Sequence, residues 1–114
     1  MAEHFSVREE RAGDAATVVC EGELDVATAP DVEKAIDGVL GSQPPSTLTL
    51  DWTGLTFMDS TGIRLLLQIV KRAASANVDL RWKLGEPAQR ALDAVGIHDD
   101  LLRQIRTYNG PDQD

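Results

Sequence analysis

The chain has 114 residues, of which 42% are hydrophobic and 26% are charged, a composition that suits one globular domain with a single core. Its formal net charge of −8 argues against nucleic acid and anionic membrane surfaces as partners, because both are bound mainly through Lys and Arg side chains. A single cysteine allows no intrachain disulfide, the polar N-terminus has no signal-peptide core, and no apolar run reaches the roughly 20 residues of a membrane span. We therefore expect a cytoplasmic protein without membrane insertion.

The first two predicted elements are strands. Phe5 and Val7 alternate with polar residues, which predicts a short first strand, and residues 16–24 are rich in β-branched side chains, which predicts a second. Gly13-Asp14 lies between them and is typical of a turn. Together these segments predict a hairpin.

A helix is predicted next. Thr28 is placed to cap its N-terminus, Pro30 suits its first turn, and Gly41 ends it. The apolar residues recur at the spacing of a helix with one buried face, namely Val32, Ala35, Ile36, Val39 and Leu40. Pro44-Pro45 then excludes a continuation of the helix.

Two further strands alternate with two further helices. Alternating apolar residues predict strands over 48–52 and 78–84. Between these strands, helical spacing begins at Ile63 and includes Leu65, Leu66, Leu67, Ile69, Val70 and Ala74. A third helix ends at Gly96 and carries Ala88, Ala91, Leu92 and Val95. Residues 97–106 fit either a short helix or a strand.

The predicted order of elements is β-β-α-β-α-β-α. Crossover helices between strands favour parallel pairing, so we expect an α/β fold with a small mixed sheet of about four strands, of which the first pair is antiparallel. We expect one domain over residues 1–108 and a disordered polar tail over residues 109–114.

The sequence offers no motif for a metal, a cofactor or catalysis. His4 and His98 lie far apart and away from Cys20, which we expect to be a buried, inert thiol. There is no glycine-rich phosphate loop, and the residues around Ser60 do not form a nucleophile elbow. We therefore expect no metal, no cofactor and no enzymatic activity.

Acidic residues gather at the end of the second strand. Glu21, Glu23 and Asp25 are two residues apart and so share one face, which is most simply a solvated face. Asp25 differs from the other two because it lies where the strand gives way to a loop, and loops often carry function. Asp25 is therefore a candidate for partner binding.

Polar residues precede the second predicted helix. Asp59 or Ser60 can cap it, since the first N–H groups of a helix lack partners within the helix. The same unpaired N–H groups favour an anion, such as a phosphate on Ser60 or Thr61. An ordinary helix cap and a modification site are both open interpretations at this point.

The neighbours of these polar residues also have two interpretations each. Phe57 can complete a buried face, and Met58 can pack on the helix start, or Met58 can be an exposed and adaptable contact. Gly62 lowers helix propensity in the first turn, which suits close approach of a partner's backbone better than it suits stability.

The segment from Leu50 to Gly62 (LDWTGLTFMDSTG) resembles the signature of the STAS domain, in the branch of bacterial anti-sigma factor antagonists. Residues 22–25 (GELD) with Thr28-Ala29 resemble an earlier motif of that family, and Glu86-Pro87-Ala88 with Gly96-Ile97 resembles its third helix and the following turn. The resemblance extends over roughly residues 5–105 and implies the STAS fold.

What this resemblance implies is a phosphorylation switch. In such antagonists the serine after the Asp, here Ser60 with Thr61 less favoured, is phosphorylated by an anti-sigma factor that is itself a serine/threonine kinase. The unphosphorylated form binds the kinase and releases the sigma factor, and a serine phosphatase resets the phosphorylated form. The implied partner-binding residues are Asp25, Thr28, Phe57, Met58, Asp59, Thr61 and Gly62.

Two other functions are compatible with the residues. One is a non-phosphorylated STAS subunit of a regulatory or transporter-linked (lipid-trafficking) complex. In such a subunit Ser60-Thr61 would only cap the helix. The acceptor serine beside Asp59 favours the phosphorylation switch instead. The other is an enzyme, which would need a base near Ser60 that the sequence does not identify. Many relatives end in a further amphipathic helix, whereas NGPDQD follows Tyr108 here, so we expect the last helix to be short or missing.

Overall fold

The computed structural model describes residues 5–41 and 43–95 and contains the elements in the predicted order. The strands are β1 (Ser6–Ala12), β2 (Ala15–Leu24), β3 (Thr47–Met58) and β4 (Asp79–Leu84). The helices are α1 (Ala29–Leu40), α2 (Ser60–Ser75) and α3 (Glu86–Val95). Predictions for residues 96–114, including a shortened last helix and a polar tail, lie outside the described residues.

The four strands form one mixed sheet in the order β1-β2-β3-β4. The hairpin of β1 and β2 is antiparallel and turns at Gly13-Asp14, where Gly13 adopts a positive φ of 61°. β2 pairs with β3 and β3 with β4 in parallel, as the intervening helices require. The predicted α/β fold with a small mixed sheet is therefore confirmed.

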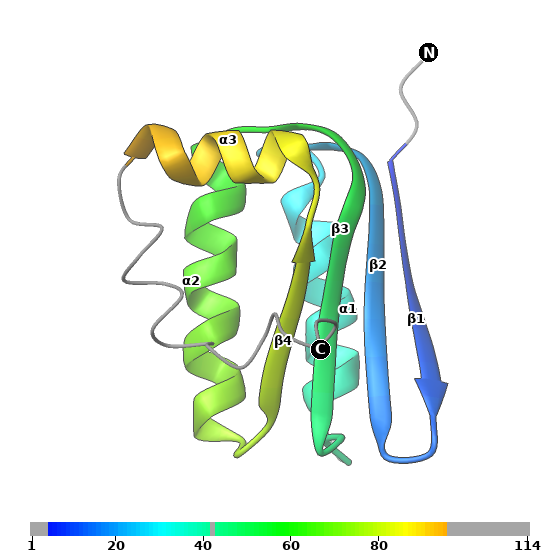
Figure 1. Ribbon diagram of the computed structural model, residues 1–114. Coiled ribbons are helices and arrows are strands. Elements are labelled where there is room, and N and C mark those ends of the chain that lie inside the picture. Colours follow the sequence, from blue (N-terminus) through cyan, green and yellow to red (C-terminus); the bar gives the residue numbers. More distant parts are fainter. Residues whose placement is uncertain (1–4, 42, 96–114) are drawn as a thin grey trace.

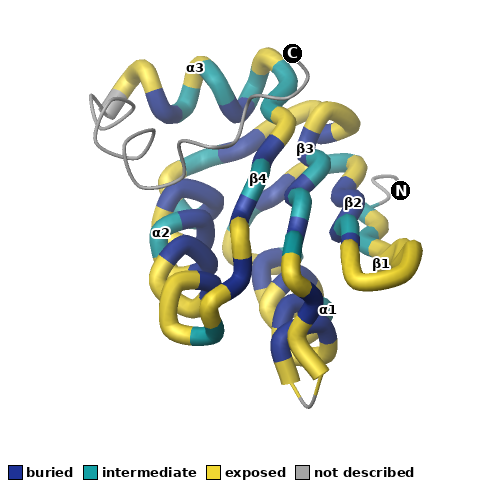
Figure 2. Tube along the Cα trace, turned by 60° about the horizontal axis from the view of Figure 1, so that its bottom comes forward, coloured by how far each residue is buried: buried dark blue, intermediate teal, exposed yellow. Residues whose placement is uncertain are grey.

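The core lies between the sheet and the helices. α1 and α2 contact each other and lie against one side of the sheet, while α3 lies across its end beside α2 and β3 (Figure 1). The two long helices carry buried residues along one side, whereas β1 is exposed along most of its length (Figure 2). The largest fully buried side chains include Trp52, Leu50 and Leu48 of β3, which therefore runs through the centre of the core.

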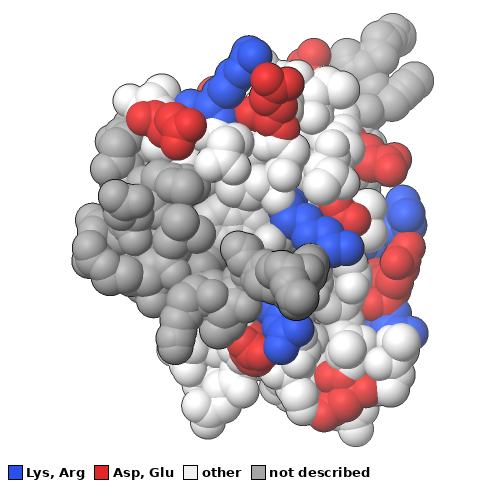
Figure 3. Space-filling model, in the orientation of Figure 1, with Lys and Arg blue, Asp and Glu red and all other residues white. Residues whose placement is uncertain are grey.

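Charges of both signs are mixed on one face of the molecule. On the side of the molecule seen in Figure 3, Lys and Arg lie next to Asp and Glu. Ion pairs on the exposed strand β1 show the same arrangement, since Arg8 pairs with Glu10 and Arg11 with Glu9, each at 3.0 Å. Exposed pairs of this kind contribute little stability, on the order of 0–1 kcal/mol each.

Strand β3 is longer than predicted, and its second half does not alternate. At the two register shifts, between Val19 and Glu21 and between Gly22 and Glu23, β3 contains one more residue than β2 each time. Beyond Trp52 the buried residues of β3 therefore recur every three positions, at Leu55 and Met58. The expectation that Phe57 completes a buried face is wrong, because the bulged strand turns this side chain outward.

Two details of the predicted helices also differ. In α2 the buried stripe includes Ala73, whereas Ala74 is exposed and Leu67 only half-buried, so the stripe is centred one position from where the spacing suggested. Thr28 does precede α1, but its side chain makes no cap hydrogen bond to the helix. No described helix is long and apolar enough to cross a membrane.

Gly62, in the first turn of α2, is buried against the end of the sheet. A Cβ at this position would lie 2.5 Å from the Cγ of Met58, 2.9 Å from its sulfur and 3.2 Å from Cδ2 of Leu24. The close approach that glycine permits is therefore made by the protein's own core, and Met58 packs beneath the helix start. Gly38, in α1, contrasts with it, because a Cβ there would meet nothing within 4 Å.

We predict that Gly62→Ala lowers the free energy of unfolding by about 1–3 kcal/mol, because overpacking outweighs the better helix propensity of alanine. Gly38→Ala is the matched control and should raise stability by about 0.5–1 kcal/mol, since it gains propensity without a clash. Urea unfolding of both variants measures the difference. If the two variants were equally stable, the packing at Gly62 would not be the constraint described here.

Candidate functional site

The candidate site lies where β2 and β3 end. Leu24 pairs with Met58 in the parallel register, so the residues that follow them, Asp25 and Asp59, begin two adjacent loops at the same edge of the sheet. Both loops lie at the end of the molecule where α3 crosses, at the top of Figure 1. The topology thus brings together two stretches that are 34 positions apart in the sequence.

Asp59 caps α2. Its Oδ1 accepts a hydrogen bond from the N–H of Thr61 at 2.9 Å, and its carbonyl oxygen accepts one from the N–H of Gly62 at 3.0 Å. Ser60 is the first residue of the helix and is exposed, and its hydroxyl has no hydrogen-bond partner among the described residues. Of the two possible caps, the carboxylate holds the position, and the serine hydroxyl is not needed for it.

Asp25 and Thr28 close the neighbouring loop on itself. The Asp25 carboxylate accepts hydrogen bonds from the N–H groups of Ala27 at 3.0 Å and Thr28 at 3.2 Å. The Thr28 hydroxyl donates to the carbonyl oxygen of Glu23 at 2.8 Å and accepts from the N–H of Asp25 at 3.0 Å. These bonds hold a tight turn with Val26 at its tip. Asp25 and Thr28 therefore fix the position of Val26 and are themselves part of the same surface.

Two exposed apolar side chains lie in the segments that meet at this edge of the sheet. Val26 is 76% exposed and Phe57 is 45% exposed, and they are the only large hydrophobic residues of the described chain that are exposed to this degree. Val26 borders a hollow with Thr61 between α1 and α2, whereas Phe57 borders a second hollow with Pro87 of α3. Ser60 is exposed, and its chain neighbourhood borders both hollows, the first through Thr61 and the second through Met58. Exposed apolar side chains near an exposed hydroxyl are typical of a protein-binding surface.

The predicted site residues differ in how far they are exposed to solvent. Phe57 and Ser60 are exposed, while Asp25, Thr28, Asp59 and Thr61 are half-buried and Met58 and Gly62 are buried. Sequence reasoning did not single out Val26 or Arg64, which lines the hollow beside Thr61. For Val26, the signal was an apolar residue in the polar loop after Asp25. No feature of the sequence pointed to Arg64.

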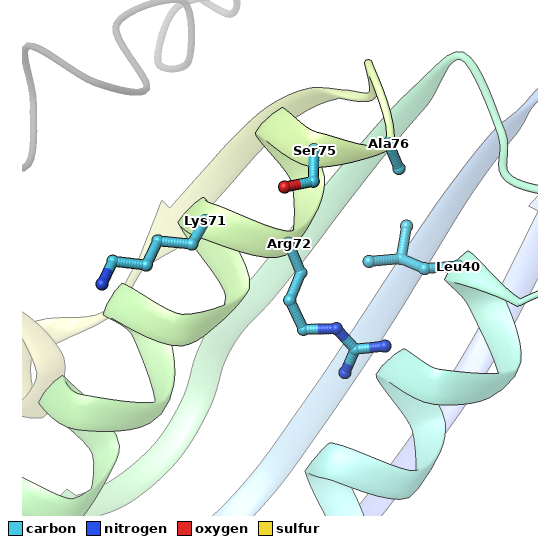
Figure 4. A pocket seen from close by; sticks show the side chains of 5 residues that line it. All are labelled: Leu40, Lys71, Arg72, Ser75 and Ala76. Atoms are coloured by element: carbon cyan, nitrogen blue, oxygen red, sulfur yellow. The ribbon is translucent and has the colours of Figure 1, made fainter.

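Other features of the molecule do not extend this site. A hollow at the opposite end of α2, lined by Leu40, Lys71, Arg72, Ser75 and Ala76, lies where α1 and α2 end (Figure 4). Arg72 reaches from α2 toward α1 and pairs with Asp37 at 2.7 Å, so its charge is already engaged. Within residues 5–41 and 43–95, no group of three His, Cys, Asp or Glu side chains could hold a metal ion; His4 and His98 lie outside these ranges.

Cys20 lies in the core of β2 and away from this surface. Burial raises the pKa of its thiol from 9.0 to about 12, so the reactive thiolate is absent at neutral pH. The expected buried thiol is confirmed, and it does not contribute to the candidate site.

Solved structures with the same fold include two anti-sigma factor antagonists. One, from Mycobacterium paratuberculosis, has a TM-score of 0.69 and 23% identity and matches 90% of this chain and 95% of its own. The other, SpoIIAA in its unphosphorylated form, has a TM-score of 0.69 and 15% identity and matches 90% of this chain and 97% of its own. At these identities the likeness shows the fold.

A more distant likeness is to the STAS domain of a SulP transporter from Vibrio cholerae, with a TM-score of 0.55 and 19% identity over 83% of this chain and 73% of that one. No curated protein matches the sequence. The family model of the STAS domain matches residues 7–109, which is nearly the whole chain. The chain therefore belongs to the STAS domain family.

Proposed function

We propose that this STAS domain is an anti-sigma factor antagonist controlled by phosphorylation of Ser60. The unphosphorylated form binds an anti-sigma factor that is a serine/threonine kinase, and this binding releases the sigma factor. Phosphorylation of Ser60 abolishes binding, and a serine phosphatase restores it. The proposal places the protein in the cytoplasm, treats residues 1–108 as one domain and assigns it no enzymatic activity of its own.

The observation that carries the proposal is the exposed hydroxyl of Ser60, which has no hydrogen-bond partner among the described residues and stands at the edge of the sheet that also exposes Val26 and Phe57. Asp59 satisfies the helix N-terminus, so Ser60 can be modified without the loss of a cap hydrogen bond. Thr61 is the less favoured acceptor because it is half-buried and its backbone N–H is held by Asp59.

A phosphate on Ser60 would change this surface sharply. It adds about −1.5 to −2 charges to a surface that exposes Val26 and Phe57, directly after Asp59 in the chain. A partner that docks on Val26 and Phe57 would then have to desolvate the phosphate, and an acidic partner surface would also be repelled. A loss of affinity of 100-fold needs only about 2.8 kcal/mol, which one buried charge readily supplies.

The two antagonist structures support this role, because the chain matches them over almost their full length. The transporter domain supports the second candidate, a STAS subunit that is never phosphorylated and only makes fixed contacts. Its TM-score is lower and the match is less complete, and a fixed contact does not require the exposed, unbonded hydroxyl of Ser60.

We predict that Ser60→Ala retains a kinase-like anti-sigma factor from the native lysate, whereas Ser60→Asp loses it. Pull-down with both baits and mass spectrometry measures this, and incubation of the wild-type chain with the captured kinase and ATP should add one phosphate at Ser60. Ser75→Ala and Ser75→Asp are the matched controls, since Ser75 is exposed at the far end of the same helix. Capture of the same transporter or scaffold subunit by both Ser60 baits would favour the second candidate instead.

We also predict that Phe57→Ser and Val26→Ser each weaken binding of the captured kinase by about tenfold or more, the loss typical of an apolar contact at an interface. Titration calorimetry measures the affinity, and urea unfolding checks that stability stays within about 1 kcal/mol of wild type. Ala74→Ser, on the exposed side of α2, is the control and should bind normally. Normal binding by both flanking variants would place the interface elsewhere.

A further inference from the structure

Arg64 differs from the other arginines of the described chain. Each of the other five described arginines pairs with a carboxylate at 3.2 Å or less: Arg8 with Glu10, Arg11 with Glu9, Arg72 with Asp37, Arg81 with Asp79 and Arg90 with Glu86. Arg64 has no hydrogen bond or ion pair from its side chain to any described residue, and it is exposed. An unpaired arginine beside the candidate site calls for a physical explanation.

The position of Arg64 relates it directly to Ser60. The two residues are four apart in α2, so their Cβ atoms lie about 5–6 Å from each other on one side of the helix. Long side chains in a helix point back toward its N-terminus, which directs Arg64 toward Ser60. Arg64 also lines the hollow that contains Thr61 and Val26. It therefore belongs to the surface around Val26, Phe57 and Ser60 on which we propose that the partner docks, here called the docking surface.

A phosphate on Ser60 would find few other donors. The N–H of Thr61 is taken by the Asp59 side chain, and that of Gly62 by the Asp59 carbonyl oxygen. The carboxylate of Asp59 would repel the phosphate. Arg90, beside the other hollow, is already paired with Glu86 at 3.0 Å. Arg64 is therefore the cation of the described chain that is best placed to meet a dianion at this position.

We propose that Arg64 is the internal partner of phosphorylated Ser60, an inference that rests on the proposed function. In the unphosphorylated protein Arg64 stays free for a carboxylate of the partner kinase. In the phosphorylated protein its guanidinium donates to the phosphate oxygens on Ser60. Phosphorylation then adds an anion to the docking surface, and it also makes Arg64 unavailable to a carboxylate of the partner. No covalent step beyond the phosphoryl transfer to the Ser60 hydroxyl is involved.

The test is a titration of the phosphate itself. The full chain is produced with phosphoserine encoded at position 60, and ³¹P NMR follows the second pKa of the phosphate in the parent, in Arg64→Gln and in Lys71→Gln. Lys71 is the matched control, because it is an exposed cation on the same helix but lies about 16 Å from Ser60 along the helix axis. Both substitutions remove one positive charge.

An adjacent guanidinium favours the dianion and so lowers the phosphate pKa. Arg64→Gln should therefore raise that pKa by roughly 0.2–0.7 unit, the range expected for an exposed charge pair, while Lys71→Gln leaves it near the parent value. Equal values in the two variants would overturn the proposal. Encoding phosphoserine removes the need for a kinase, so this result stands whether or not the pull-down with Ser60 variants supports the switch. Failure of the pull-down, conversely, leaves the pairing of Arg64 open to the same measurement.

Discussion

The parallel pairing of β2 with β3 is the constraint on which the candidate site depends. Parallel neighbours end at the same edge of a sheet, and the register that joins Leu24 to Met58 makes Asp25 and Asp59 begin adjacent loops. Burial of Leu24 and Met58 beneath Gly62 then fixes the start of α2 on that edge. A shift of this register by one residue would turn the buried side chains outward, so core packing and site geometry are specified together.

At this edge of the sheet, carboxylates make the hydrogen bonds that hold the backbone, and the neighbouring hydroxyl and apolar side chains take no part in them. Asp25 and Asp59 each accept backbone N–H groups, which holds the two loops in place. The hydroxyl of Ser60 and the apolar side chains of Val26 and Phe57 are not needed for those bonds and remain exposed. A surface of this kind can be modified at small cost to folding, which is what a reversible switch requires.

Much of this fold could be predicted from the sequence. Apolar residues recur every two positions in most of its strands and every three or four positions in its helices. The second half of β3 could not, since its bulges change the period to three and turn Phe57 outward. For Gly62, sequence showed a weak helix former but not Met58 packed against it. Arg64 illustrates the same limit, because an unpaired charge is defined only by neighbours that folding brings together.

The placement of the cap determines what kind of switch this surface can be. If Ser60 capped α2, a phosphate there would disturb the helix start, and the packing of Gly62 on Met58 would couple that disturbance to the core. Since Asp59 holds the cap, the backbone hydrogen bonds of the first turn can persist after modification. The proposed switch therefore acts through the charge of the surface rather than through its shape. The partner would meet an added phosphate and would lose contact with Arg64, while the backbone of the surface stays unchanged.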